Sequence, residues 1–126
     1  MAQQKRAWIY CHIDALEDKH GSLKGQEREL MDYAEEMGFE IAGVSTDLGS
    51  GSDFERTGLM EVMKAAEDGK MDELLVKCLD RVGRDTIKVL EFLQGLEKLG
   101  IRLYTPLEGE IKLIQFKEIY HGFVME

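Results

Sequence analysis

The segment Leu79–Thr86, with the sequence LDRVGRDT, places two arginines beside two aspartates. Arg81 and Arg84 are three residues apart, so a helical turn that begins nearby would bring both side chains to one anion. Guanidinium groups bind phosphate through a bidentate fork, and a helix N-terminus adds partial positive charge. Asp80 can orient one of the arginines. The alternative interpretation is a surface salt-bridge cluster around a turn, which this spacing alone favours.

The chain around this segment resembles the catalytic domain of resolvase/invertase serine recombinases. Leu74–Thr86, LLVKCLDRVGRDT, is similar to the family's third strand and following turn. Arg6–Asp14, RAWIYCHID, stands where the family's first strand ends in Y-A-R-V-S. The stretch SLKGQERELMDYAEEMGFE resembles the family's S-L-x-x-Q helix, STDLGSGSDFERTGL its mobile loop with an arginine, and IRLYTPLEGEI its fourth strand. The resemblance therefore covers nearly the whole chain.

The resemblance implies a role for five residues in DNA strand exchange through a phosphoserine intermediate. Arg56, Arg81 and Arg84 match the arginines that contact the scissile phosphate and stabilise its charge in the transition state. Asp80 matches the acidic residue beside them, and Gln26 matches a helix glutamine near the active site. Phosphoryl transfer depends mainly on positioning and on electrostatic stabilisation, so this set is chemically reasonable without a cofactor.

Three positions depart from the family pattern. His12 and Asp14 stand at the positions of an arginine and of the nucleophilic serine, and Asp18 stands at a glutamine position. An attacking carboxylate would give a hydrolysable acyl phosphate, and histidine carries less dependable charge than arginine near neutral pH. We therefore expect strand cleavage to be absent or very weak. Asp14 is expected to form salt bridges with Arg81 and Arg84, filling the place of a phosphate, which would lower its pKa.

Two other function classes stay open at this point. The first is a binding module that uses the arginine cluster for a phosphate or a nucleotide. The second is a metal-dependent hydrolase, because His12 and Asp14 share one strand face and Asp80 follows a neighbouring strand. Cys11 points to the other face, and the chain has no compact ligand motif, so we expect neither a metal nor another cofactor.

Apolar periodicity predicts the elements that must position these residues. Their alternation indicates a mainly parallel sheet with helices on both faces, an α/β three-layer sandwich with sites at the carboxyl ends of the strands. The tail Glu110–Glu126 fits either a strand or a helix. The predicted strands are Arg6–Asp14, Phe39–Thr46, Glu73–Cys78 and Ile101–Thr105. The predicted helices are Leu23–Met37 capped by Ser22, Thr57–Asp68 capped by Thr57, and Asp85–Leu99.

Length and composition set limits on the function. A chain of 126 residues fits a single domain, with a core at 1–109 and a C-terminal segment at 110–126. The net charge of −9 counts against tight DNA binding by this chain alone. The chain has no apolar run long enough to cross a bilayer and no signal peptide, so we expect a cytoplasmic protein. Cys11 and Cys78 are expected to be buried free thiols.

The point at which the chain ends also bears on its partners. It ends soon after the position where the long dimer-forming helix of the family would begin, so we expect a truncated or degenerate recombinase domain. Such a domain can be a remnant of a mobile element, or it can act in a homo-oligomer or with an active recombinase partner. DNA is the partner that the resemblance implies.

Overall fold

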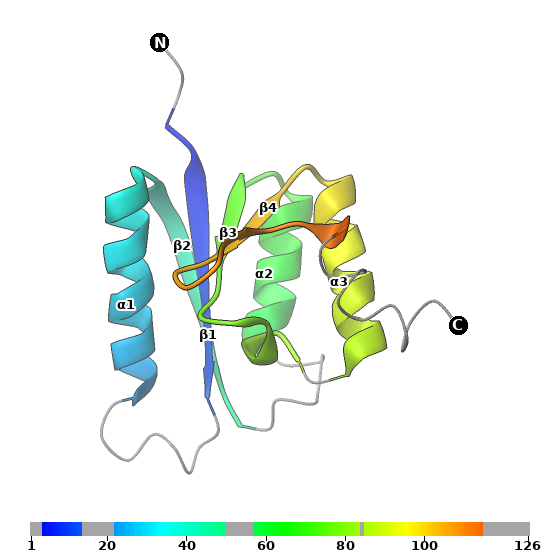
Figure 1. Cartoon of the computed structure of the whole chain (residues 1–126), viewed down its shortest axis with the longest axis horizontal. Helices are drawn as coiled ribbons and strands as arrows, with labels where there is room; N and C mark the ends of the chain where they lie inside the picture. Colours follow the sequence, from blue (N-terminus) through cyan, green and yellow to red (C-terminus); the bar gives the residue numbers. More distant parts are fainter. Residues whose placement is uncertain (1–3, 14–21, 50–56, 84, 115–126) are drawn as a thin grey trace.

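The computed structural model describes residues 4–13, 22–49, 57–83 and 85–114. Figure 1 shows how the elements in these ranges follow one another along the chain. In chain order they are β1 Arg6–Ile13, α1 Ser22–Met37, β2 Glu40–Leu48, α2 Thr57–Glu67, β3 Glu73–Leu75, the 3-10 turn η2 Leu79–Arg81, α3 Thr86–Lys98, β4 Arg102–Thr105 and β5 Gly109–Ile111.

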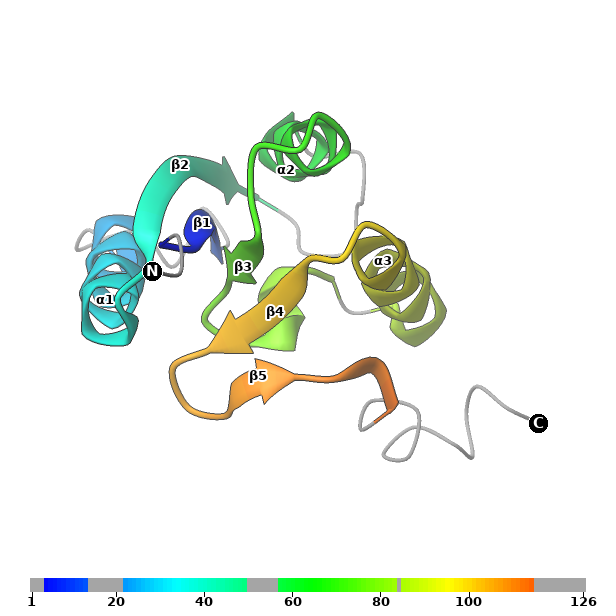
Figure 2. The ribbon, with the colours of Figure 1, turned by 90° about the horizontal axis from the view of Figure 1, so that it is seen from above.

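The strands form one sheet in the order β2-β1-β3-β4-β5. β1 pairs in parallel with β2 and β3, β3 pairs in parallel with β4, and only β5 runs antiparallel to its neighbour. The view along the sheet in Figure 2 shows α1 on one face and α2 and α3 on the other. The predicted three-layer α/β architecture is confirmed. No helix in the described ranges has the length and apolar character to cross a membrane.

Two strand ends differ from the prediction by two residues or more, because pairing, and not apolar character, decides where a strand ends. β3 stops at Leu75, whereas the prediction continued it to Cys78, because the chain leaves the sheet there and enters η2. β2 runs to Leu48, two residues beyond its predicted end, because it pairs with β1 as far as Ile13. The sequence left open whether the tail Glu110–Glu126 forms a strand or a helix. Its first two residues belong to the strand β5.

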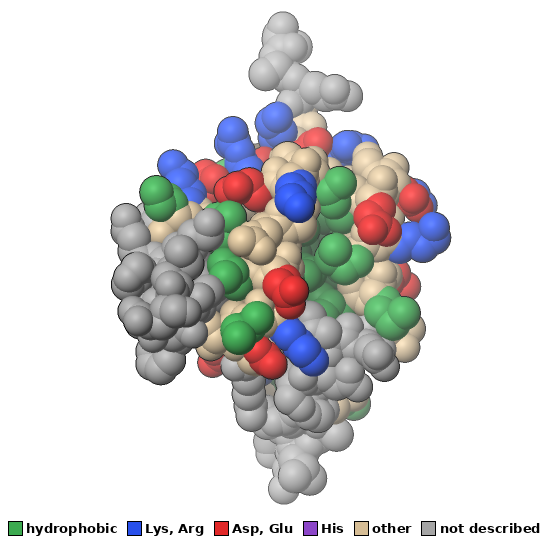
Figure 3. Space-filling view, turned by 90° about the vertical axis from the view of Figure 1, so that its right-hand side faces the viewer, with side chains coloured by type: hydrophobic (Ala, Val, Ile, Leu, Met, Phe, Trp, Pro, Cys, Tyr) green, Lys and Arg blue, Asp and Glu red, His purple; other side chains and the backbone are tan. Residues whose placement is uncertain are grey.

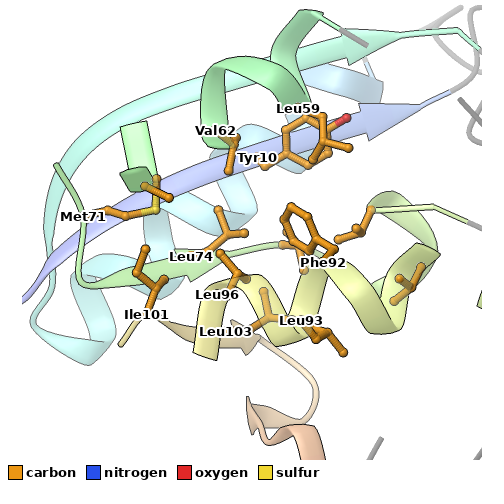
Figure 4. Packing of buried hydrophobic residues seen from close by; sticks show 14 of the residues in the cluster. Tyr10, Leu59, Val62, Met71, Leu74, Phe92, Leu93, Leu96, Ile101 and Leu103 are labelled. Atoms are coloured by element: carbon orange, nitrogen blue, oxygen red, sulfur yellow. The ribbon is translucent and has the colours of Figure 1, made fainter. Parts of the chain in front are cut away.

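Buried apolar residues form two clusters, one on each face of the sheet. The cluster beneath α1 includes Ile9, Leu30 and Leu75. The larger cluster lies under α2 and α3, and Figure 4 shows Tyr10 and Phe92 within it. Since both faces of β1 are covered, its consecutive residues from Ile9 to Ile13 are all buried, as predicted for a central parallel strand.

One buried residue of the sheet is charged and plays no part in either apolar cluster. Glu73, at the start of β3, is only 2% exposed, and its Oε2 atom has no hydrogen-bond partner in the described part of the chain. Burial raises the pKa of its carboxyl group, and the positive charges of Arg102 and Lys5 only partly oppose that shift. Ionised Glu73 therefore lowers the stability of the folded state.

Replacing Glu73 with glutamine is expected to stabilise the protein in a pH-dependent way. Because the folded pKa is raised above the unfolded value, wild type is at full stability at acidic pH and loses stability as pH rises through the folded pKa. Glu73→Gln should therefore match wild type at acidic pH and exceed it by about 1 kcal/mol above neutrality. Urea unfolding at several pH values measures this, with the exposed Glu97→Gln as control. A difference that does not change with pH would contradict the assignment.

Candidate functional site

The carboxyl ends of β1 and β2 and the turn η2 meet at one edge of the sheet. His12 near the end of β1 pairs in register with Asp47 of β2. Arg81, the last residue of η2, reaches back across this edge and donates from Nη1 to the backbone carbonyl of His12 at 3.2 Å. The structure therefore brings together two predicted site residues that are far apart in the sequence, at the edge where parallel sheets carry their sites.

A third predicted residue, Gln26 of α1, lies against the same backbone. The His12 N–H donates to Gln26 Oε1 at 3.0 Å, and Gln26 Nε2 donates to the His12 carbonyl at 3.4 Å. Gln26 is 5% exposed, so it is a buried side chain and not a solvated helix residue. Its polar groups are satisfied by the backbone N–H and C=O of a single residue of β1.

The imidazole of His12 makes a contact that the sequence did not indicate. His12 is 3% exposed, and its Nε2 lies 2.8 Å from the carbonyl oxygen of Gly49. A carbonyl oxygen only accepts, so Nε2 carries the proton of this hydrogen bond. The ring therefore links the end of β1 to the residue that follows β2.

Asp47 is a residue of this edge that the sequence analysis did not include among the site residues. Its carboxylate accepts hydrogen bonds from the Tyr10 hydroxyl at 2.7 Å and from the backbone N–H groups of Gly58 and Leu59 at 2.8 and 2.9 Å. Asp47 thus caps α2, and the predicted capping by Thr57 is wrong. The position of Asp47, directly after a predicted strand, was the one signal in the sequence that could have identified it.

The described part of the arginine cluster shows contacts that the sequence did not indicate. Within the described residues, the exposed Asp80 carboxylate makes no salt bridge, and it is the His12 carbonyl that holds Arg81. α3 starts only at Thr86, and the Asp85 carboxylate accepts hydrogen bonds from the N–H groups of Ile87 and Lys88. Asp85 thus caps the N-terminus of α3, and the contribution of this N-terminus to the arginine cluster stays a prediction, because Arg84 lies outside the described residues.

Several predicted site residues lie outside the described residues, namely Asp14, Asp18, Arg56 and Arg84. The convergence of the three arginines and the contacts of Asp14 therefore remain predictions. Among the described residues, no three His, Cys, Asp or Glu side chains come together as metal ligands. The hypothetical metal site includes Asp14, so that site as a whole is not tested.

The two cysteines are free, as predicted, and Cys11 is buried whereas Cys78 is half-buried. Burial raises the pKa of the Cys11 thiol to about 12, with smaller contributions from Glu27 and Glu29. A thiol with so high a pKa is not a nucleophile near neutral pH, because the thiolate is the reactive form. Cys11 is therefore part of the core and not of the site.

We call the place where His12, Gln26 and Arg81 meet the arginine site. An open groove lies away from it, between α2 and α3. It has a volume of about 930 Å³, and Leu59, Met60, Met63 and Phe92 form its apolar lining. Of the described residues, His12, Gln26 and Arg81 do not line it. Among the described side chains on the face shown in Figure 3, acidic and basic groups are interspersed around apolar ones.

Comparisons with protein families and with curated proteins both match this chain to resolvases. A family model described as "Resolvase, N terminal domain" matches residues 14–120. A putative resolvase of Acanthamoeba polyphaga mimivirus is 25% identical over 119 residues, which are 92% of this chain and 53% of the relative. The transposon Tn3 resolvase of Escherichia coli is 36% identical over 80 residues, 64% of this chain and 40% of that protein. The chain thus spans about half the length of these relatives, or less.

Two catalytic domains of known structure have a fold similar to that of this chain. The N-terminal catalytic domain of TP901-1 integrase aligns with a TM-score of 0.81 at 25% identity, over 94% of this chain and 95% of that chain. The C-terminal catalytic domain of ISC1926 TnpA, an IS607-like serine recombinase, aligns with a TM-score of 0.74 at 26% identity, over 79% of this chain and 68% of that chain.

Proposed function

This chain belongs to the resolvase N-terminal domain family, and from that membership we propose that it holds a DNA phosphodiester but does not cut it efficiently. The observation that carries the proposal is the contact between Arg81 and the His12 carbonyl at the carboxyl end of β1. It anchors a side chain that the family resemblance assigns to the phosphate beside His12, one of the three positions where this sequence departs from the family. The family's arginine is kept at position 81, whereas Asp14 and His12 replace the nucleophilic serine and another arginine.

The proposed chemistry follows from the residue types. Arg81, with Arg56 and Arg84 joining it, neutralises a phosphodiester through charge-assisted hydrogen bonds. Asp14 at the nucleophile position has no hydroxyl to attack phosphorus, and its negative charge repels the phosphate. His12 donates from Nε2 to Gly49, so its ring serves the protein interior and substitutes poorly for an arginine directed at the substrate.

DNA and further protein subunits are the proposed partners. A net charge of −9 disfavours strong binding of DNA by this domain alone, since affinity for DNA rests on cation release from phosphates. We therefore assign DNA affinity to an assembly, either a homo-oligomer or a complex with an active recombinase. The domain then contributes the arginine site to that assembly.

The Asp14→Ser variant tests the phosphate site without requiring cleavage. It removes a negative charge next to the arginines, so affinity for a short DNA duplex should rise about tenfold at low salt. Fluorescence anisotropy measures the affinity, and Arg81→Ala should lower it in both backgrounds. Asp32→Ser, which makes the same change at an exposed position of α1, controls for net charge. An equal gain in the two serine variants would refute the proposal.

A further inference from the structure

Gln26 of α1 holds both backbone polar groups of one residue of β1. Its side-chain amide accepts from the His12 N–H at 3.0 Å and donates to the His12 carbonyl at 3.4 Å. Both residues are buried, at 5% and 3% exposure, so water does not compete for these groups. The amide of Gln26 thus takes the place of a neighbouring strand at the end of β1 and holds the two peptide groups on either side of the His12 Cα atom.

The same carbonyl oxygen also holds Arg81. Arg81 Nη1 donates to it at 3.2 Å, so a donor from α1 and a donor from η2 share one acceptor. A carbonyl oxygen has two lone pairs, and these two donors use both. The direction in which the carbonyl points decides where the guanidinium group of Arg81 lies, and Gln26 sets that direction.

We infer that Gln26 is a positioning residue that orients Arg81 through the His12 peptide and does not itself touch the substrate. Because only 5% of Gln26 is exposed, little of its surface is available to a ligand. An apolar side chain would pack at this buried helix position without needing partners, so the amide is explained by the peptide that it holds. The inference rests on the proposed function, since it concerns how the phosphate-binding arginine is held.

The test uses the free protein and follows Arg81 directly. Arg81 Nε is shielded from solvent, so its N–H proton should give an observable NMR signal, which the Arg81→Lys variant identifies by its loss. In Gln26→Leu this signal should shift, and its exchange with solvent should become at least about fivefold faster. Gln26→Glu keeps an acceptor for the His12 N–H but loses the donor to the carbonyl, so it should shift the signal as well.

Two controls separate positioning from general loss of stability. Gln94→Leu makes the same chemical change on α3, and Ala34→Gly weakens α1 without changing the contact to His12. Both should leave the Arg81 signal in place. An unchanged Arg81 signal in folded Gln26→Leu, or in Gln26→Glu if the leucine variant does not fold, would overturn the inference. Failure of the proposed function is seen separately, as an absence of Arg81-dependent DNA affinity in wild type and Asp14→Ser.

Discussion

Replacing Asp47 with alanine is expected to lower the free energy of unfolding by about 3 kcal/mol, one of the largest effects of any single polar substitution at this edge of the sheet. The Asp47 carboxylate joins three parts of the molecule, because it accepts from the Tyr10 hydroxyl and from two N–H groups at the start of α2. Alanine leaves all three donors without this acceptor. A loss of this size is a large fraction of the stability of a small domain.

The magnitude follows from two separate contributions. Loss of a helix cap costs about 1 kcal/mol, and loss of a hydrogen bond to a charged acceptor costs about 1.5–3 kcal/mol when the donor is buried. Tyr10 is fully buried, so its hydroxyl cannot turn to water. Gly58 adds a geometric constraint, since a Cβ atom there would meet the Thr46 carbonyl oxygen and the Asp47 carboxylate. The absence of a side chain at Gly58 therefore lets the start of α2 lie close to β2.

Urea unfolding followed by the fluorescence of Trp8, the single tryptophan, measures this loss. Asp68→Ala, which removes an exposed ion pair with Lys64, should cost less than about 0.5 kcal/mol and serves as the control. Tyr10→Phe should destabilise wild type but have little effect in Asp47→Ala, because the shared hydrogen bond is already lost. Additive losses in the double variant would contradict the proposed link between β1 and α2.

The order of the elements could be predicted because each leaves a local pattern. Val76 and the apolar residues before it mark a strand, and the leucines of α3 recur at helical spacing. Asp85 could be recognised at the start of α3 because a cap acts on N–H groups two and three residues away. Gly38 and Gly100 adopt positive φ angles of 77° and 73°, as expected for residues that end a helix.

The contacts of the site could not be predicted, because they join residues far apart in the sequence. Arg81 donates to a carbonyl 69 positions earlier, and a backbone carbonyl leaves no trace in the sequence. The local pattern instead suggested that Asp80 orients one of the arginines and that a helix N-terminus adds positive charge for the same anion. Asp47 likewise caps α2 from the preceding strand, across a segment that separates them in the chain, whereas sequence reasoning looked for a cap only at Thr57.

The family resemblance supplied what the local patterns lacked. It selected Gln26, Arg81 and the His12 position as one group, and the structure brings these three together. It did not show how they are joined, because the same residue types can bind a substrate or one another. Only the geometry assigns Gln26 to the backbone of β1 and the His12 ring to Gly49.

The His12→Arg, Asp14→Ser double variant is expected to form a covalent protein–DNA adduct at least about 100-fold more than wild type. It restores a hydroxyl nucleophile, whose ester with phosphate can be reversed by the free DNA end, and a permanent cation beside it. The scaffold that positions them is already present, since Arg81 and Gln26 fix the His12 backbone. The side chain at position 12 changes, but its peptide contacts do not depend on it.

Matched variants show which of the two substitutions is needed to form the covalent adduct. Asp14→Asn removes the charge without adding a nucleophile, so it should bind DNA better and still form no adduct. Asp14→Ser alone should form less adduct than the double variant, because His12 remains bonded to Gly49. Adding Arg81→Ala to the double variant should abolish the adduct. An equally active Arg81→Ala form would show that the arginine site does not hold the reacting phosphate.

The most direct measurement is the intact mass of the wild-type protein after incubation with a suicide DNA substrate that traps any covalent intermediate. The double variant under the same conditions provides the positive control, and fluorescence anisotropy confirms that wild type binds the DNA. We predict that wild type binds in an Arg81-dependent way and retains its unmodified mass. A wild-type adduct whose added mass maps to Asp14 would contradict the proposal that this domain keeps the phosphate site and has lost cleavage.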